Sequence, residues 1–136
     1  AKYMYIFPVV GIVIGIIVGT LGFGLSEAGI EPLIVGLLVV TATAIITGIH
    51  HTDGLADFAD GLMAKGSKEK KLSAMKDVTT GSSGIVAIVL YFIGMIIALS
   101  LTNGFELFQA ILFAEIISKF SMVLMKKILQ LEQHLM

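Results

Sequence analysis

Long apolar stretches alternate with polar connections along this chain. The apolar stretches cover residues 3–25, 32–50, 84–101 and 105–125. Each approaches the roughly 20 residues that an α-helix needs to cross a bilayer. The connections before the second and fourth stretches are short turns, whereas residues 51–83 form a long polar segment. The pattern predicts an all-α integral membrane protein, a single domain over residues 1–136 built as a bundle of about four transmembrane helices.

The composition supports this assignment. Hydrophobic residues make up 57% of the chain and charged residues 14%, whereas soluble domains carry about 25% charged residues. The net charge of −1 gives no indication of a nucleic-acid partner. The chain has no cysteine, which excludes disulfides and thiolate chemistry within it. The expected surroundings are therefore a lipid bilayer, and we interpret the first apolar run as a retained span rather than a signal peptide.

The lysines predict the orientation of the spans. If every apolar stretch crosses once, all lysines fall on one side of the membrane except Lys119, which lies within the fourth span. Cytoplasmic loops are enriched in Lys and Arg. We therefore expect a multi-pass protein of the cytoplasmic membrane, with both termini and the 51–83 loop in the cytoplasm.

Three aspartates stand at helical spacing in the segment GIHHTDGLADFADGL, residues 48–62. Asp53, Asp57 and Asp60 are spaced i, i+4, i+7, which places them on one face of a helix. Adjacent carboxylates repel one another unless a cation compensates, and hard oxygen ligands favour Mg²⁺, Ca²⁺ or Mn²⁺. We interpret the cluster as a metal site; the alternative is that the aspartates only cap and solvate the end of the second span.

A second polar cluster precedes the third span. Asp77 is followed by a segment rich in glycine and hydroxyl side chains, which includes Gly81, Ser82, Ser83 and Gly84. The start of a helix presents free N–H groups and the positive end of the dipole, which suits a phosphate group; ordinary N-capping by serine is the alternative. A metal beside a phosphate site in a membrane indicates transfer of a phosphate-bearing group to or from an amphipathic substrate. We expect the active site within residues 50–84.

Two further features lie inside the spans. Glu115 and Lys119, at i and i+4 in the fourth span, can form an ion pair, and such a pair is either a functional site or a neutralised structural pair. Gly11, Gly15 and Gly19 form a strip of small residues in the first span. We expect this strip to pack against another helix, and it would also allow a homo-oligomer.

Several of these segments together resemble the cobalamin synthase family, also called adenosylcobinamide-GDP ribazoletransferases. The segments are His51-x-Asp53-Gly54-Leu55-Ala56-Asp57-x-x-Asp60-Gly61, Met75-Lys76-Asp77, Gly81-x-x-Gly84 and Glu115-x-x-Ser118-Lys119. The family's Asp-Ser-Arg-x-Gly pattern reads Asp77-Val78-Thr79-Thr80-Gly81 here, and Lys76 partly replaces the missing arginine. In the fourth span, Lys119 and Phe120 stand where the family has Arg and Trp.

The resemblance implies a Mg²⁺-dependent membrane transferase. It would join α-ribazole or its 5′-phosphate to adenosylcobinamide-GDP and release GMP, in the nucleotide-loop assembly step of cobalamin biosynthesis. The implied catalytic residues are His51, Asp53, Asp57, Asp60 and Asp77, and the four aspartates would be the metal ligands. The implied substrate-binding residues are Lys76, Gly81, Ser82, Ser83, Gly84, Glu115 and Lys119.

Two other functions fit parts of the pattern. CDP-alcohol phosphotransferases also place aspartates at helical spacing, but their motif reads Asp-x-x-Asp-Gly-x-x-Ala-Arg, and this chain contains no arginine. A cation transporter subunit could use membrane aspartates, but its ion site would be expected near the bilayer midplane. The acids of residues 53–77 cluster at the predicted cytoplasmic edge.

Overall fold

The computed structural model describes residues 6–48, 50–76 and 79–135, and within these ranges it contains helices and no strands. This confirms the all-α fold class. The six helices are α1 (Ile6–Glu27), α2 (Pro32–Thr47), α3 (His50–Met63), α4 (Lys68–Ala74), α5 (Ser82–Ser100) and α6 (Gly104–Leu135).

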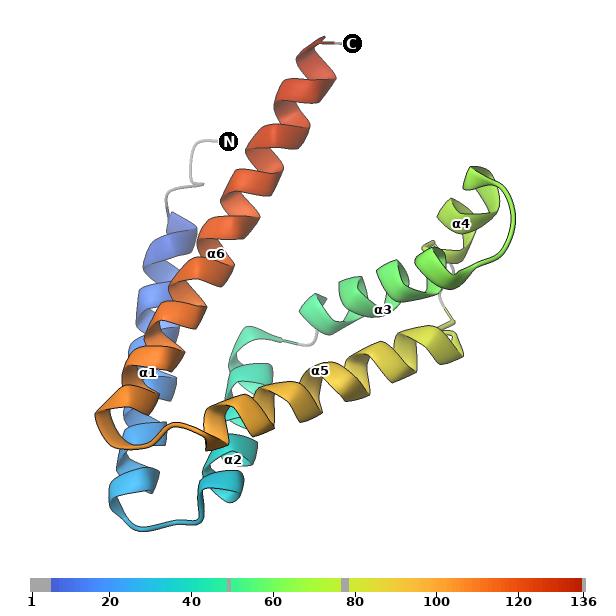
Figure 1. The fold of residues 1–136 in the computed structure, drawn as a ribbon. Helices are drawn as coiled ribbons and strands as arrows, with labels where there is room; N and C mark the ends of the chain where they lie inside the picture. The colour runs from blue at the N-terminus through green and yellow to red at the C-terminus, as the bar shows by residue number, and fades with distance from the viewer. Residues whose placement is uncertain (1–5, 49, 77–78, 136) are drawn as a thin grey trace.

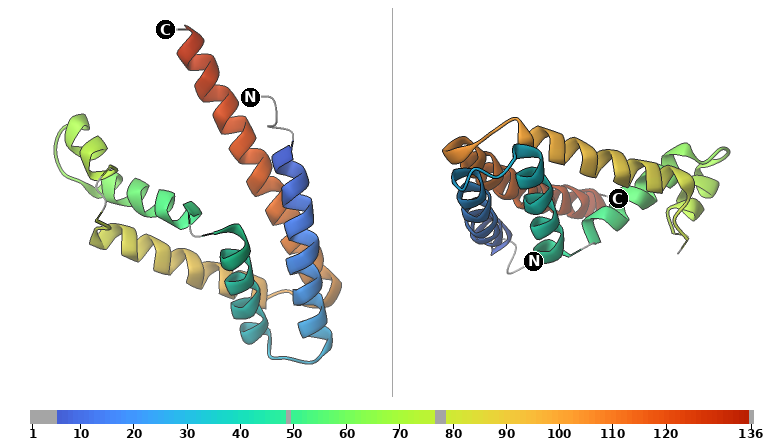
Figure 2. Two further views of the ribbon diagram at one scale, coloured as in Figure 1. Left: turned by 180° about the vertical axis from the view of Figure 1, so that it is seen from behind. Right: turned by 90° about the horizontal axis from the view of Figure 1, so that it is seen from below.

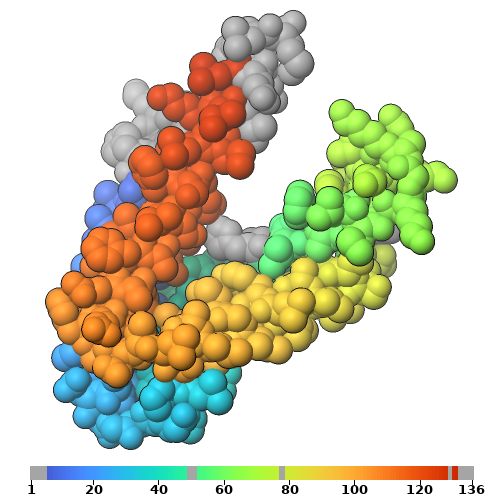
Figure 3. Space-filling model, viewed as in Figure 1, coloured from blue at the N-terminus to red at the C-terminus, as the bar shows by residue number. Residues whose placement is uncertain are grey.

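The helices form a V (Figure 1). Antiparallel α1 and α6 make one arm, and α5 with α3 alongside it makes the other, with α4 at its tip. Helix α2 stands near the vertex, where it packs against α1 and α5 (Figure 2). The space-filling view shows the open side of the V between α6 and α3 (Figure 3).

The two turns at the vertex are joined by a hydrogen bond between segments far apart in sequence. The Gly104 N–H donates to Ser26 Oγ at 2.8 Å, which ties the start of α6 to the end of α1. Gly104 has φ +51°, in the region where a Cβ is disfavoured. The α1–α2 turn and the α5–α6 turn therefore lie at one end of the molecule, as the predicted topology requires.

The glycine strip of α1 packs against α6 within the same chain. A Cβ placed on Gly11 would lie 2.8 Å from the Glu115 carbonyl oxygen, and one on Gly15 would lie 3.0 Å from Leu112 Cα. Gly19 likewise faces Phe108. Small residues allow helix backbones to approach this closely, so the expectation of helix packing is confirmed. These contacts also fix the position of Glu115 and Lys119 along the length of α1.

The buried core is small and lies where α1, α2 and α6 meet. It contains Ile14, Val18, Val35, Val39, Leu107 and Ile111. Most other large apolar side chains are exposed, including Ile45 at 77% and Leu101 at 80%. Water would penalise such a surface heavily, whereas lipid would not, so the exposure pattern agrees with an integral membrane protein.

The second predicted span differs from the helix that forms. Helix α2 ends at Thr47 rather than at residue 50, because Gly48 adopts φ +76° and breaks the helix. Helix α3 then continues at 94° to α2. Among the described residues, α1, α5 and α6 are long and apolar enough to cross a membrane, and the α2–α3 pair makes a fourth only if it counts as one bent span.

Candidate functional site

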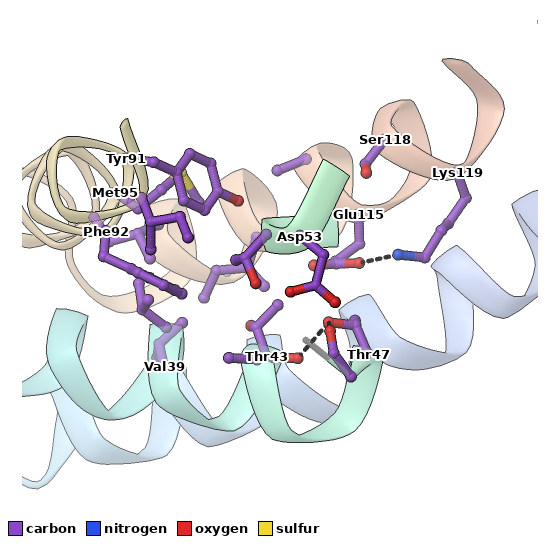
Figure 4. A pocket seen from close by; sticks show the side chains of 18 residues that line it. Val39, Thr43, Thr47, Asp53, Tyr91, Phe92, Met95, Glu115, Ser118 and Lys119 are labelled. Atoms are coloured by element: carbon purple, nitrogen blue, oxygen red, sulfur yellow. Dashed lines mark hydrogen bonds and ion pairs between the residues drawn. The ribbon is translucent and has the colours of Figure 1, made fainter. Parts of the chain in front are cut away.

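A cavity of about 390 Å³ lies inside the angle of the V, between α2, α3, α5 and α6. Its wall is mostly apolar, with Val39 from α2 and Tyr91, Phe92 and Met95 from α5 (Figure 4). Its polar groups gather at one end, where Asp53 of α3 comes close to the Glu115 region of α6. The cavity therefore pairs an apolar wall with a charged end, a common arrangement in small-molecule sites.

The bend at Gly48 is what brings Asp53 into this cavity. Gly48 and Thr52 line the cavity together with Asp53. The Thr47 hydroxyl donates to the Thr43 carbonyl at 2.8 Å, and both residues line the cavity on the α2 side.

Glu115 and Lys119 form the ion pair that the sequence predicts. The distance from Lys119 Nζ to Glu115 Oε2 is 3.6 Å, and the two side chains are 7% and 12% exposed. Glu115 Oε2 accepts no hydrogen bond within the part of the chain that the structure describes. This buried oxygen has a nearby positive charge but still lacks a hydrogen-bond donor. A ligand hydroxyl could supply that donor, because an unsatisfied buried acceptor is costly.

The charged end of the cavity carries two carboxylates and one ammonium. Asp53, Glu115 and Lys119 come from two separate predicted clusters, and the fold places them on one cavity. A lysine that lines the same cavity as two acids can hold a phosphate oxygen while the acids accept hydrogen bonds from hydroxyl groups. This arrangement suits a polar ligand that carries both kinds of group.

Asp60, on the same face of α3, has different partners. Its carboxylate accepts hydrogen bonds from the Gly81 N–H at 2.6 Å and from the Gly84 N–H at 2.8 Å. These donors belong to the start of α5, where we expected a substrate phosphate. An anion does bind there, but it is the Asp60 carboxylate. Phosphate binding by the Gly81–Gly84 segment remains a prediction, with two of its backbone donors already engaged.

The remaining predicted residues lie elsewhere. Asp57 is half-buried on α3 and makes no hydrogen bond or ion pair with the described residues. Lys76 is exposed beside α4, where it lines a shallow depression with Glu69, Leu72 and Ser73. Ser82 and Ser83 begin α5 outside the cavity wall. The side chain of His51 and the whole of Asp77 lie outside the described residues.

The predicted metal site does not assemble from the described side chains alone. In the described ranges, no group of three or more His, Asp or Glu residues converges closely enough to hold an ion. Asp53 faces the cavity and Asp60 faces α5, so they diverge although they share a helix face. The donor chemistry still suits Mg²⁺, because that ion usually takes one or two carboxylates and completes its shell with water and substrate phosphates.

Sequence reasoning missed much of the cavity wall. Tyr91, Phe92 and Met95 line it, but in the sequence they are indistinguishable from lipid-facing residues of an apolar span. Nothing in the sequence marked Thr43 and Thr47 as cavity residues either. Only knowledge of where α2 ends could have shown that these residues face Asp53.

The fold and the cavity define a class: an all-helical integral membrane protein with a buried Glu–Lys pair and an aspartate at one internal site. The chain belongs to the cobalamin-5-phosphate synthase family, whose model matches residues 1–133.

Individual relatives agree with this family assignment. An adenosylcobinamide-GDP ribazoletransferase of Methanosarcina barkeri is 35% identical over 133 residues, covering 90% of this chain and 47% of the relative. One from Geotalea daltonii is 36% identical over 122 residues, covering 90% and 49%. One from Thermococcus gammatolerans is 47% identical over 78 residues, covering 57% and 32%. The chain thus spans about half the length, or less, of these relatives. No solved structure matches it.

Proposed function

We propose that the protein to which this chain belongs is an adenosylcobinamide-GDP ribazoletransferase. It joins α-ribazole or its 5′-phosphate to adenosylcobinamide-GDP and releases GMP, in the nucleotide-loop assembly step of cobalamin biosynthesis. The observation that carries the proposal is the meeting of Asp53 with the buried Glu115–Lys119 pair in one cavity. Family membership and the names of the relatives supply the substrates.

The cavity residues have distinct tasks in this proposal. Lys119 faces the charge that builds on the phosphate oxygens, in a site where a preorganised cation is worth more than in water. Glu115 Oε2 accepts a hydrogen bond from the attacking hydroxyl of the ribazole, whose proton must leave as the new phosphate ester forms. The apolar wall of Tyr91, Phe92 and Met95 receives the aromatic base of the ribazole.

Magnesium is part of the proposal. Asp53 and Asp57 lie on consecutive turns of α3 and would hold the ion together with the pyrophosphate of the GDP-linked substrate. Asp77 is a further candidate ligand from outside the described residues. When bound, Mg²⁺ neutralises charge on the pyrophosphate and on the departing GMP.

The orientation in the membrane follows the lysines. The α3–α4 segment and the turn after it carry Lys65, Lys68, Lys70, Lys71 and Lys76, at the same end of the molecule as the two termini (Figure 1). The opposite end holds the α1–α2 and α5–α6 turns, which have no lysine. We therefore place the α3–α4 segment, and with it the charged end of the cavity that Asp53 lines, toward the cytoplasmic side of the cell membrane.

The test is release of GMP by the purified whole protein in lipid vesicles. GMP should form from adenosylcobinamide-GDP only when both α-ribazole phosphate and Mg²⁺ are present. A CDP-linked alcohol donor, offered in parallel, should release no CMP. Turnover of the CDP-linked donor alone would reassign the protein to CDP-alcohol chemistry. Absence of turnover with either donor, together with Mg²⁺ flux into the vesicles, would favour a transporter.

A further inference from the structure

The contact between α3 and α5 depends on Asp60. Both oxygens of this carboxylate are engaged, Oδ2 by the Gly81 N–H and Oδ1 by the Gly84 N–H. The residue at the N-cap position of α5 is Gly81, which has no side chain to provide this cap. An aspartate more than 20 residues upstream therefore performs the capping function that Ser, Asp or Asn normally performs locally.

Small residues on both helices make room for this contact. A Cβ on Gly81 would lie 2.6 Å from Asp60 Oδ1, and one on Gly84 would lie 2.6 Å from Asp60 Oδ2. The Gly84 position also faces Ala56 of α3, with 3.0 Å between the Ala56 Cβ and a Cβ built on Gly84. Such distances require glycine at both α5 positions as long as the Asp60 carboxylate stays in place.

Besides the Asp60 contact, helix α3 packs along α5 and against the short helix α4. It leaves α2 at 94° after the break at Gly48. The Asp60 carboxylate binds where the helix dipole places roughly half a positive charge. This polar anchor lies two turns beyond Asp53, so it sets the direction in which α3 runs and the point at which Asp53 meets the cavity.

We propose that Asp60 is a positioning residue that fastens α3 to the start of α5, and that it is not a ligand of the metal. This proposal rests on the proposed function in one respect, namely that Asp53 and Asp57, the residues being positioned, bind the substrate and its ion. It divides the aspartates of the motif by role: the first two serve the substrate and its ion, and the third holds the helix that carries them. To turn toward an ion shared with Asp53, this carboxylate would have to give up its hydrogen bonds to the Gly81 and Gly84 N–H groups of α5.

Metal binding separates the two roles. Mn²⁺, used as a paramagnetic substitute for Mg²⁺, is titrated into the purified whole protein and followed by electron paramagnetic resonance. Asp60→Asn should bind Mn²⁺ within about twofold of the parent, because its amide oxygen still accepts one of the two N–H groups. The matched control Asp57→Asn should bind at least tenfold more weakly. An equal loss in both variants would overturn the proposal.

Thermal unfolding tests the fastening itself and does not depend on activity. Asp60→Ala leaves two N–H donors at the start of α5 without their partner and should lower the Tm, whereas Asp57→Ala should leave it unchanged. Gly84→Ala, which pushes the carboxylate out, should also lower the Tm. Gly94→Ala on the same helix, where a Cβ meets nothing within 4 Å, should not. An unchanged Tm of Asp60→Ala would contradict the proposal.

A covalent link provides the rescue. Residues 1–136 contain no cysteine, so Ala56→Cys with Gly84→Cys is the one pair within them; any cysteine elsewhere in the whole protein is first replaced by serine. The 3.0 Å between the two Cβ positions is slightly below the roughly 3.5–4.5 Å of a disulfide, and removing the Asp60 carboxylate gives the new side chains room. If Asp60 only positions α3, oxidation should restore Tm and GMP release to an Asp60→Ala protein carrying this pair.

The rescue also distinguishes failure of this inference from failure of the proposed function. If oxidation restores Tm and the parent releases no GMP, the fastening stands and the transferase assignment falls. If the parent releases GMP and oxidation restores Tm without activity, Asp60 has a role in the chemistry and the inference is wrong.

Discussion

Adding one methyl group at Gly11 tests the packing that supports the site. In Gly11→Ala the new Cβ would lie 2.8 Å from the Glu115 carbonyl oxygen and 3.0 Å from Lys119 Cγ, where ordinary contacts begin at 3.4 Å. The nearest atom belongs to the backbone and cannot rotate away. Helices α1 and α6 must therefore separate by about half an ångström, and overpacking of this kind costs about 1–3 kcal/mol.

Gly24→Ala is the matched control, because it lies on the same helix and its Cβ meets nothing within 4 Å. Both substitutions gain the same helix propensity, about 0.5–1 kcal/mol, so the difference between them isolates the packing cost. We expect Gly11→Ala to be about 1–3 kcal/mol less stable than Gly24→Ala.

The assay is unfolding by sodium dodecyl sulfate in mixed micelles, followed by circular dichroism. Gly11→Ala should also reduce GMP release, because Glu115 and Lys119 shift with α6, while Gly24→Ala should not. Equal stability of the two variants would refute the close contact of α1 with α6 at this position.

Three further predictions concern the ion pair, α4 and the topology. Lys119→Met leaves Glu115 buried without its cation, which should cost about 3–5 kcal/mol; adding Glu115→Gln should recover the stability but not GMP release, and a stable single variant would count against the pair. The Ser67 side chain hydrogen-bonds to Glu69 and lowers the pKa of that exposed carboxyl below its ordinary 4.5, so this contribution to α4 is present above that value and is lost as pH falls through the lowered pKa. Titration of Glu69 followed by NMR should show a smaller lowering of its pKa in Ser67→Ala, because the backbone hydrogen bond of Glu69 remains; an unchanged pKa would contradict the role of Ser67. Cysteines introduced at Lys68 and Glu27 should react with a membrane-impermeant maleimide from opposite sides of the membrane, and labelling of both from one side would refute the topology.

The apolar pattern predicted the helices well and their ends less well. Long apolar runs are sufficient to predict α1, α5 and α6, because a bilayer stabilises any uninterrupted apolar helix of that length. The end of α2 depends on one backbone angle at Gly48, and a glycine inside an apolar run is equally common in unbroken membrane helices. The bend at Gly48, and with it the cavity, could not be predicted from periodicity.

Helical spacing also predicted a shared face for the aspartates but not their separate partners. Asp53, near the start of α3, lines the cavity that α6 also lines, and Asp60, two turns further on, meets α5. Both placements depend on packing between segments far apart in sequence. The Glu115–Lys119 pair was predictable because its two residues are neighbours on one helix. The partner of the Gly11 strip was not, because a strip of small residues fits any helix that approaches it.

The central claim is that substrate binds in the cavity inside the angle of the V. Ser118 lines that cavity on α6 (Figure 4). Residues 1–136 contain no cysteine, so within them Ser118→Cys gives a single reactive thiol. Its rate of reaction with a small thiosulfonate should fall at least tenfold when adenosylcobinamide-GDP and Mg²⁺ are added, whereas a cysteine at the exposed loop residue Lys65 should react at an unchanged rate. Full reactivity at position 118 under conditions in which GMP is being released would contradict the account, because the substrate would then bind elsewhere.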